Sequence, residues 1–228
     1  TVTDGAGLTA TSTQTVTVVD NQNPTIDTLT AINVNSDAGV CTYVSSQLTA
    51  PTTGDNCSVA SVVATPVSLV LGANTVTWTV TDGAGLTATS TQTVTVVDNQ
   101  NPTIATLTAI NVNSDAGVCT YVSSQLTAPT TDDNCSVASV VATPVSLVLG
   151  ANTVTWTVTD GSNNTATSTQ TVTIEDNEDP TIATLVAITL DSDAGFCTYA
   201  SSQLTAPAGS DNCSVASVVA TPVSLVLG

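Results

Sequence analysis

The chain repeats itself every 78 residues, and this repeat limits the folds open to it more than any other feature. The string Thr-Val-Thr-Asp-Gly begins at Thr1, Thr79 and Thr157, so that 79 − 1 and 157 − 79 both give 78. Near-identical units of this length indicate a tandem array of small domains. The Asn/Asp-Pro segments divide the chain into 1–19, the last strands of a preceding repeat, whole repeats at 20–97 and 98–175, and 176–228, the first part of a further repeat.

Within each repeat, apolar and polar residues alternate as expected for half-buried strands. In residues 75–81 Val76, Trp78 and Val80 share one face, and threonines occupy the other. Residues 91–96 show the same alternation, and the Asp-Gly-Ala-Gly segment 82–85 between them predicts a hairpin turn. Valine, threonine and isoleucine dominate these segments and only 3% of residues are aromatic, which favours strands over helices.

The number of strands in a repeat predicts how the chain passes through it. Further strands are predicted at 25–35, 40–49, 58–63 and 67–71. If Cys41 bonds Cys57, segment 50–57 must run back beside the strand that starts at Cys41, and it supplies a seventh pass. An odd number of passes lets a module begin at one pole and finish at the other. We therefore expect an all-β fold of tandem Ig-like or fibronectin III-like seven-stranded β-sandwiches, arranged end to end.

The charge balance excludes several classes of function. Lys, Arg and His are absent, whereas Asp and Glu number 18, so the net charge is −18. No basic side chain can replace the counterions of a nucleic acid, so we expect no such partner. Histidine-dependent nucleophilic catalysis and imidazole-bound metal sites lack their usual groups. Paired carboxylates can hydrolyse glycosides. An active site would need an arrangement of side chains that occurs in one repeat alone, and the sequence has none, so we expect that the chain is not an enzyme. No apolar run reaches the roughly 18 residues of a membrane span, so we expect no membrane insertion in this segment.

The six cysteines follow the repeat, with two cysteines 16 positions apart in each copy. A regular, even set without histidine or a CxxC motif indicates disulfides in an oxidising, extracellular setting. Each predicted bond closes a loop of roughly 15 residues, worth about 3 kcal/mol in the chain-entropy model. The predicted pairs all lie within repeats: Cys41–Cys57, Cys119–Cys135 and Cys197–Cys213.

Several short segments recur in a fixed order and spacing: 20–21, 24–26, 32–35, Asp37, 39–41, Pro51, 55–57, 72–76 and 81–83. In this order they resemble the hyalin repeat (HYR) family, Ig-like modules of animal extracellular proteins and of large adhesive surface proteins in bacteria such as Bacteroidota. In that family a second cysteine pair is frequent, and Thr28 and Ser90 occupy its positions here, so packing must hold the first and last strands together. The resemblance covers the whole chain and implies adhesion or extension at a bacterial cell surface, without catalysis.

Acidic and amide residues concentrate at the two junctions between repeats. Calcium prefers oxygen ligands of this kind, and we expect Asp37 and Asp55 to gather at the pole that meets Asp98. The arrangement resembles the calcium-stiffened linkers of cadherins. The alternative is that Asp-Asn and Asn-Pro segments form ordinary turns with solvated carboxylates. The candidate calcium ligands are Asp37, Asp55, Asp98, Asn99, Asn101 and Asp160 at the first junction, and Asp115, Asp133, Asp176, Glu178 and Asp179 at the second.

These observations favour a structural or adhesive extracellular stalk or filament. Its repeats would supply length, and its negative charge would limit aggregation of sheet edges. Its partners would be neighbouring repeats and identical chains in a fibre. An alternative is a module that binds glycans, surfaces or proteins through avidity. Strand exchange between chains is a third interpretation, because 1–19 resembles the strands that 176–228 lacks.

Overall fold

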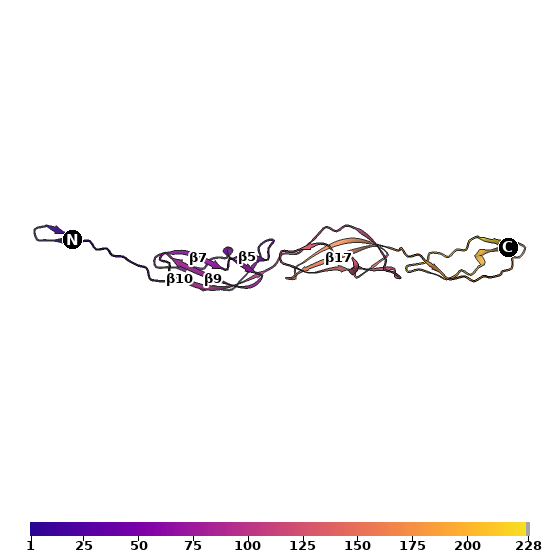
Figure 1. Cartoon of the computed structure of the whole chain (residues 1–228), viewed down its shortest axis with the longest axis horizontal. Helices are drawn as coiled ribbons and strands as arrows, with labels where there is room; N and C mark the ends of the chain where they lie inside the picture. Colours follow the sequence, from indigo (N-terminus) through magenta and orange to yellow (C-terminus); the bar gives the residue numbers. More distant parts are fainter. Residues whose placement is uncertain (227–228) are drawn as a thin grey trace. The chain divides into compact units, whose positions relative to one another are not determined.

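The computed structural model describes residues 1–226, and the chain divides into two units, Thr1–Gln100 and Asn101–Gly228. Each unit contains the strands of one whole repeat, and the two repeats have the same order of strands. Residues 1–226 contain no α-helix, and three short 3-10 turns are their only helical elements. The predicted all-β fold is therefore confirmed (Figure 1).

The elements of the two units correspond one to one across the whole repeats. The first unit contains β1 (Val2–Thr3), β2 (Thr9–Ala10), β3 (Thr25–Ile26), β4 (Ile32–Asn35), β5 (Thr42–Val44), η1 (Ser45–Gln47), β6 (Thr53–Gly54), β7 (Val59–Thr65), β8 (Ser68–Val70), β9 (Gly72–Asp82) and β10 (Thr87–Val97). The second contains β11 (Thr103–Ile104), β12 (Ile110–Asn113), β13 (Thr120–Val122), η2 (Ser123–Gln125), β14 (Thr131–Asp132), β15 (Val137–Thr143), β16 (Ser146–Val148), β17 (Gly150–Asp160) and β18 (Thr165–Glu175). It continues with β19 (Thr181–Ile182), β20 (Thr198–Ala200), η3 (Ser201–Gln203), β21 (Gly209–Ser210) and β22 (Ser224–Val226).

Each whole repeat is a sandwich built around a long hairpin. In the first repeat β9 and β10, labelled in Figure 1, form the hairpin. They pair antiparallel over ten residue pairs, and β4 runs parallel to β10 in a sheet of order β4-β10-β9-β7. The second layer consists of two short ladders, β3-β6 and β5-β8. Because the predicted first strand divides into β3 and β4, one in each layer, the sandwich has eight strands and not seven.

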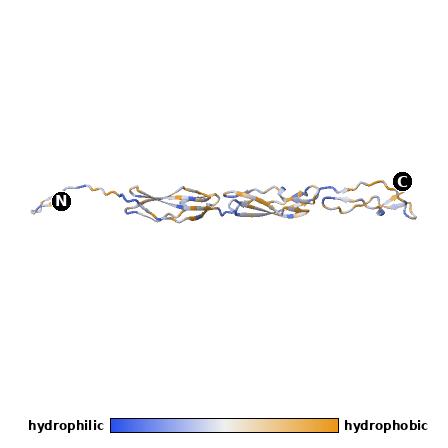
Figure 2. Ribbon diagram, turned by 90° about the horizontal axis from the view of Figure 1, so that it is seen from below, coloured by the Kyte–Doolittle hydropathy of each residue, from blue (hydrophilic) through white to orange (hydrophobic). Residues whose placement is uncertain are grey.

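Alternating side chains of the hairpin form the core. Val76, Trp78 and Val80 of β9 are at most 4% exposed, as are Val94 and Val96 of β10. The core is completed from the second layer, by Leu69 of β8 and by Leu48, which follows η1. The threonines between these positions lie on the outer face, and the alternation of hydropathy along the strands can be followed in Figure 2. This inward phase confirms the period-two pattern predicted from the sequence.

A buried glutamine ties the bend between β3 and β4 to the large sheet. Trp78 Nε1 donates to Gln92 Oε1 at 3.2 Å, and Gln92 Nε2 donates to the Thr30 carbonyl at 3.1 Å. Gln92 is only 6% exposed, so its amide needs these partners.

The two partial repeats, 1–19 and 176–226, have little apolar packing. Val16 and Val18 are 73% and 90% exposed, and no strand includes them. In the last piece β19 pairs with β21 and β20 with β22, and Val186 is 82% exposed. Strand exchange between chains stays a prediction.

We predict that Gln92→Leu loosens the first repeat alone. The change leaves Trp78 Nε1 and the Thr30 carbonyl without their partner, at a cost of about 1–3 kcal/mol. Hydrogen exchange should accelerate at the β9 and β10 amides, whereas the second repeat, where Trp156 retains Gln170 at 3.0 Å, serves as the internal control. Unchanged exchange in β9 would show that the tether contributes nothing.

Candidate functional site

The first whole repeat carries a cluster of acidic groups at one pole. Asp20, Asp55 and Cys57 offer oxygen and sulfur atoms that lie within 4.8 Å of one another. Asp55 Oδ2 accepts the backbone N–H groups of Cys57 and Ser58 at 2.8 and 2.9 Å. Asp20 Oδ1 accepts the Gln22 N–H at 3.1 Å. Each carboxylate is thus positioned by the turn that it closes.

The hairpin turn between β9 and β10 brings a third carboxylate to this pole. Asp82 Oδ1 accepts the N–H groups of Ala84 and Leu86 at 2.9 and 2.8 Å. Gly83 donates its N–H to the Ser58 carbonyl at 3.0 Å, and a Cβ at Gly83 would lie 2.6 Å from Ser58 Oγ. The lack of a Cβ at Gly83 lets the turn pack directly against the loop that holds Asp55 and Cys57.

Two oxygens in this cluster are buried without a hydrogen bond among the residues described. They are Asp82 Oδ2, on a side chain that is 2% exposed, and Asp55 Oδ1. A buried carboxylate oxygen is costly to leave unsatisfied, and the chain has no Lys or Arg to pair with it. The cluster therefore has the charge and the donor atoms to hold a cation.

The charges in the cluster perturb the neighbouring groups. The pKa of Cys57 is raised, chiefly by the charge of Asp20 and next by burial, with further contributions from Asp55 and Asp82. The pKa of Asp20 is lowered, chiefly by the N–H of Gln22, against the opposing effect of burial. A cation bound here would relieve the repulsion that the Cys57 thiolate experiences.

The second whole repeat has a similar arrangement, but its equivalent of Asp82 has an additional hydrogen-bond partner. Asp133 and Asp160 offer carboxylate oxygens within 4.8 Å of each other, and Asp160 is 1% exposed. In this repeat Asn164 Nδ2 donates to Asp160 Oδ2 at 2.7 Å. Burial raises the pKa of Asp160, but hydrogen bonds from Asn164 and from the turn backbone outweigh it, and the net shift is downward. Asp160 is therefore satisfied at the oxygen that Asp82 leaves unpartnered.

Two predicted ligands belong to the opposite pole. Asp37 follows β4 and accepts hydrogen bonds from Val44 N and Gln47 Nε2, at 3.0 and 2.8 Å, and Asp115 makes the equivalent pair in the second repeat. The 11-residue strand β9 separates this pole from Asp82, a distance of about 30 Å. The prediction that Asp37 and Asp55 gather at one pole is therefore wrong.

Some of the other predicted ligands are buried or lie beside further acidic groups, and the rest are exposed. Asp98 is 3% exposed and accepts the Gln100 N–H at 3.1 Å, whereas Asn99, Asn101 and Asp179 are exposed. Asp176 forms a further cluster, in which its carboxylate lies within 4.8 Å of Asp211 and Cys213 atoms. Sequence reasoning missed Asp20, Asp82 and Asp211, although the repeated Thr-Asp-Gly and Asp-Asn-Cys strings marked two of these three positions.

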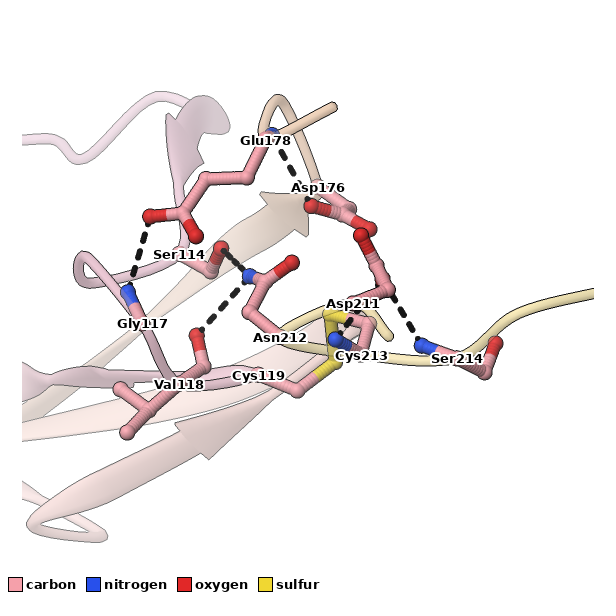
Figure 3. The surroundings of a disulfide bond; sticks show 10 residues. All are labelled: Ser114, Gly117, Val118, Cys119, Asp176, Glu178, Asp211, Asn212, Cys213 and Ser214. Carbon is pink, nitrogen blue, oxygen red and sulfur yellow. Dashed lines mark hydrogen bonds between the residues drawn. A yellow bond between two sulfur atoms is a disulfide. The ribbon is translucent and has the colours of Figure 1, made fainter. Parts of the chain in front are cut away.

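The disulfide between Cys119 and Cys213 crosses a repeat boundary. Cys119 bonds Cys213, 94 residues further on, with Cα atoms 4.7 Å apart (Figure 3). Cys41 and Cys135 are also disulfide-bonded, whereas Cys57 and Cys197 are free. All three predicted pairs, Cys41–Cys57, Cys119–Cys135 and Cys197–Cys213, are therefore wrong. The two cysteines of one repeat lie at opposite poles of the sandwich, beyond the roughly 7 Å limit of a disulfide.

Hydrogen bonds flank the Cys119–Cys213 bond. Asn212 Nδ2 donates to Ser114 Oγ and to the Val118 carbonyl, both at 3.3 Å, and Glu178 Oε1 accepts the Gly117 N–H at 2.8 Å (Figure 3). The loop 114–119 is thus held from the following repeat on both sides of the disulfide. Glu178, a predicted calcium ligand, accepts a backbone N–H in this structure, and its role as a ligand stays a prediction.

We predict that peptide mapping under non-reducing conditions recovers this bond. Cleavage before aspartate places Cys119 in 115–131, Cys135 in 133–159 and Cys213 in 211–228, so the alternatives give different linked peptides. Alkylation before cleavage should label Cys57 and Cys197. A peptide pair that joins 115–131 to 133–159 would restore the pairing within repeats.

Comparisons with known proteins give no family assignment. Neither a protein-family model nor a curated protein sequence matches the chain. Among the residues described, no helix is long and apolar enough to cross a membrane.

Solved structures similar to this chain include Drosophila N-cadherin EC1-4, with 9% identity over 68% of this chain and 50% of that one at a TM-score of 0.35. Human mucin-like protocadherin EC1-2 has 14% identity over 69% and 100% of the two chains at 0.35. Human desmocollin-1 ectodomain has 11% identity over 83% and 46% at 0.24. The chain spans about half the length of the N-cadherin structure.

Proposed function

We propose that this chain is a stretch of an extracellular structural stalk or filament, adhesive at a cell surface, whose successive repeats are locked by disulfides. The observation that carries the proposal is the Cys119–Cys213 bond. A bond within one repeat would stabilise only that module, whereas this bond fixes one repeat to the next. The hydrogen bonds of Asn212 and Glu178 reinforce the same contact.

The chemistry of the chain supports an extracellular setting. Disulfides persist in oxidising compartments, and the resemblance to HYR repeats favours a bacterial surface protein. A glycan- or protein-binding role acting through avidity has less support, because Trp78 and Trp156 are only 4% and 3% exposed and cannot stack on a sugar. We propose no catalytic activity for this chain.

A test of the stalk compares two double variants of the full chain by small-angle scattering. Removing Cys119 and Cys213 together should broaden the distribution of distances in the second unit, because its two pieces then keep only hydrogen bonds and the backbone between them. The matched control replaces Cys57 and Cys197, which removes two thiols but no bond. Identical profiles for the two variants would show that the disulfide does not fix the spacing of repeats.

We further propose that calcium binds at the pole formed by Asp20, Asp55 and Asp82. Calcium accepts six to eight oxygen ligands, and the three carboxylates would supply part of this set. The unpartnered Asp82 Oδ2 and Asp55 Oδ1 support a bound cation. In the second repeat Asn164 already satisfies Asp160, so we expect the site beside Asp82 to be the stronger one.

Cys57 provides a reporter for this site. In a Cys197→Ser background, calcium should speed the alkylation of Cys57 by iodoacetamide at pH 8, because neutralising Asp20 and its neighbours lowers the pKa of the thiol. The thermal midpoint should rise as well. Asp82→Asn should reduce both effects, and Asp27→Asn, at an exposed position outside the cluster, should leave them unchanged. Equal rates with calcium and with chelator would remove the metal from the proposal.

A further inference from the structure

One edge of the large sheet in each whole repeat has no strand beside it. β15 is the last strand in the order β12-β18-β17-β15, and β7 holds the same place in the first repeat. Within residues 1–226, no ladder joins the outer side of either strand. Backbone N–H and C=O groups along such an edge can pair with a further strand. We propose that these two edges pair antiparallel with the equivalent edges of a second copy of this chain.

A groove beside β15 leaves space for an added strand. It lies between β15 and the part of the second layer that contains η2, and its lining includes the core residue Trp156. The lining residues that β15 contributes are Val140, Val141 and Ala142. None of the residues that line the groove is charged. A strand of this acidic chain can therefore approach β15 without direct repulsion from a carboxylate.

The side chains of β15 are divided between the core and the solvent. Val140 and Ala142 are half-buried and pack against the core, whereas Ser139 and Thr143 are exposed. Val141 is 50% exposed, and its equivalent Val63 in the first repeat has the same value. The segment Ser-Val-Val-Ala-Thr is identical in the two repeats, at 139–143 and 61–65. Uncharged, β-branched segments of this kind pair readily when they lie on an exposed edge.

Two features limit the pairing to residues 139–143. The register of β15 against β17 shifts between Val137 and Ser139, and a bulge of this kind disrupts the regular ladder. Pro144 follows the strand and has no N–H to donate. The open segment is about 17 Å long. Because a contact of this length is small, we expect a reversible association between copies.

Antiparallel pairing of this segment with itself is self-complementary. When the pairing is centred on Val141, that residue lies opposite Val141 of the second copy. Ser139 then lies opposite Thr143 of the second copy, and the same pair recurs on the other side of the centre. Hydroxyl pairs and β-branched pairs directly opposite each other stabilise antiparallel strands. The segment therefore supplies both halves of the contact.

The distribution of charge selects the antiparallel direction. Asp160 pairs with Val137 at the start of β15, and carboxylate oxygens of Asp133 and Asp160 lie within 4.8 Å of each other. Because Val137 is four positions from Val141, antiparallel pairing sets these acidic groups of the two copies about 27 Å apart along the strands. This distance exceeds the screening length of about 8 Å at physiological salt. Parallel pairing would place them side by side.

The same distribution favours a second copy over other occupants. Residues 134–159 contain no charged side chain, whereas the carboxylates described above lie at the poles of the repeat. A basic partner would be attracted to the poles, and an acidic partner would gain nothing from an uncharged edge. The pairing would join stalks side by side. The inference thus goes beyond the proposed stalk, which does not depend on it.

The first test measures association of the full chain by sedimentation velocity, in a Cys57→Ser/Cys197→Ser background so that no free thiol can link copies. The dimer should strengthen between about 0.15 M and 1 M salt, because the screening length falls from about 8 to about 3 Å and the acidic chains repel each other less. A chain that stays monomeric at both salt concentrations, up to about 1 mM protein, would overturn the inference and leave the groove to a strand of another protein.

A charge placed at the centre of the contact tests the register. In the Val63→Glu/Val141→Glu chain, like charges would lie directly opposite each other, and association should weaken by about tenfold. The matched control, Val70→Glu/Val148→Glu, adds the same charge at positions that are 61% exposed on β8 and β16, and it should associate as the background does. All four positions are exposed, so the thermal midpoints should stay equal. Equal weakening in the two variants would overturn the inference.

A charge-swapped pair completes the test. The Val63→Lys/Val141→Lys chain mixed with the Val63→Glu/Val141→Glu chain should form mixed dimers, which native mass spectrometry distinguishes by mass. Their yield should exceed that of either homodimer by about tenfold, because each lysine faces a glutamate. The Lys chain mixed with the Val70→Glu/Val148→Glu chain should show no such preference, and an equal preference would contradict the register. None of these results alters the scattering test of the Cys119–Cys213 bond, so the stalk and the edge contact can fail separately.

Discussion

Every carboxylate in this protein has to be satisfied without a cationic side chain, because the chain contains no Lys, Arg or His. Backbone N–H groups donate most of the hydrogen bonds that these carboxylates accept. Asp55 and Asp82 each accept two N–H groups from the turns that follow them, and Asp37 accepts one together with a glutamine amide. The turns in turn hold the ends of the strands. The acidic residues therefore shape the loops at both poles of each repeat, and the cysteines are positioned by those loops.

The strands of the large sheet were predictable because their signal is local. The alternation of valine and threonine in β9 and β10 fixes which side chains face the core, and Val76, Trp78 and Val80 are buried as that pattern requires. The division of the first strand into β3 and β4 was not predictable in this way. It depends on Gln92, which lies 62 residues from the Thr30 carbonyl that it holds.

The cysteine pairing could not be read from the spacing of 16 residues. That spacing suits a short loop, but the intervening chain runs through β5, η1 and β6 and carries Cys57 to the pole opposite Cys41. The same crossing separates Asp37 from Asp55. A bond across the repeat boundary encloses 94 residues instead of about 15, which raises the chain-entropy estimate from about 3 to between 4 and 5 kcal/mol. It also couples the unfolding of one repeat to its neighbour.

The parallel pairing of β4 with β10 has a mechanical consequence. β4 lies near the beginning of a repeat, after the short strand β3, and β10 ends the repeat; Ile32 pairs with Val94 and Asn35 with Val97. Tension applied through the chain pulls β4 toward its beginning and β10 toward its end, so the two strands are driven past each other along their length. The bonds of the ladder then share the load and break together, not one after another. Each repeat can thus bear tension through the backbone hydrogen bonds that join β4 to β10.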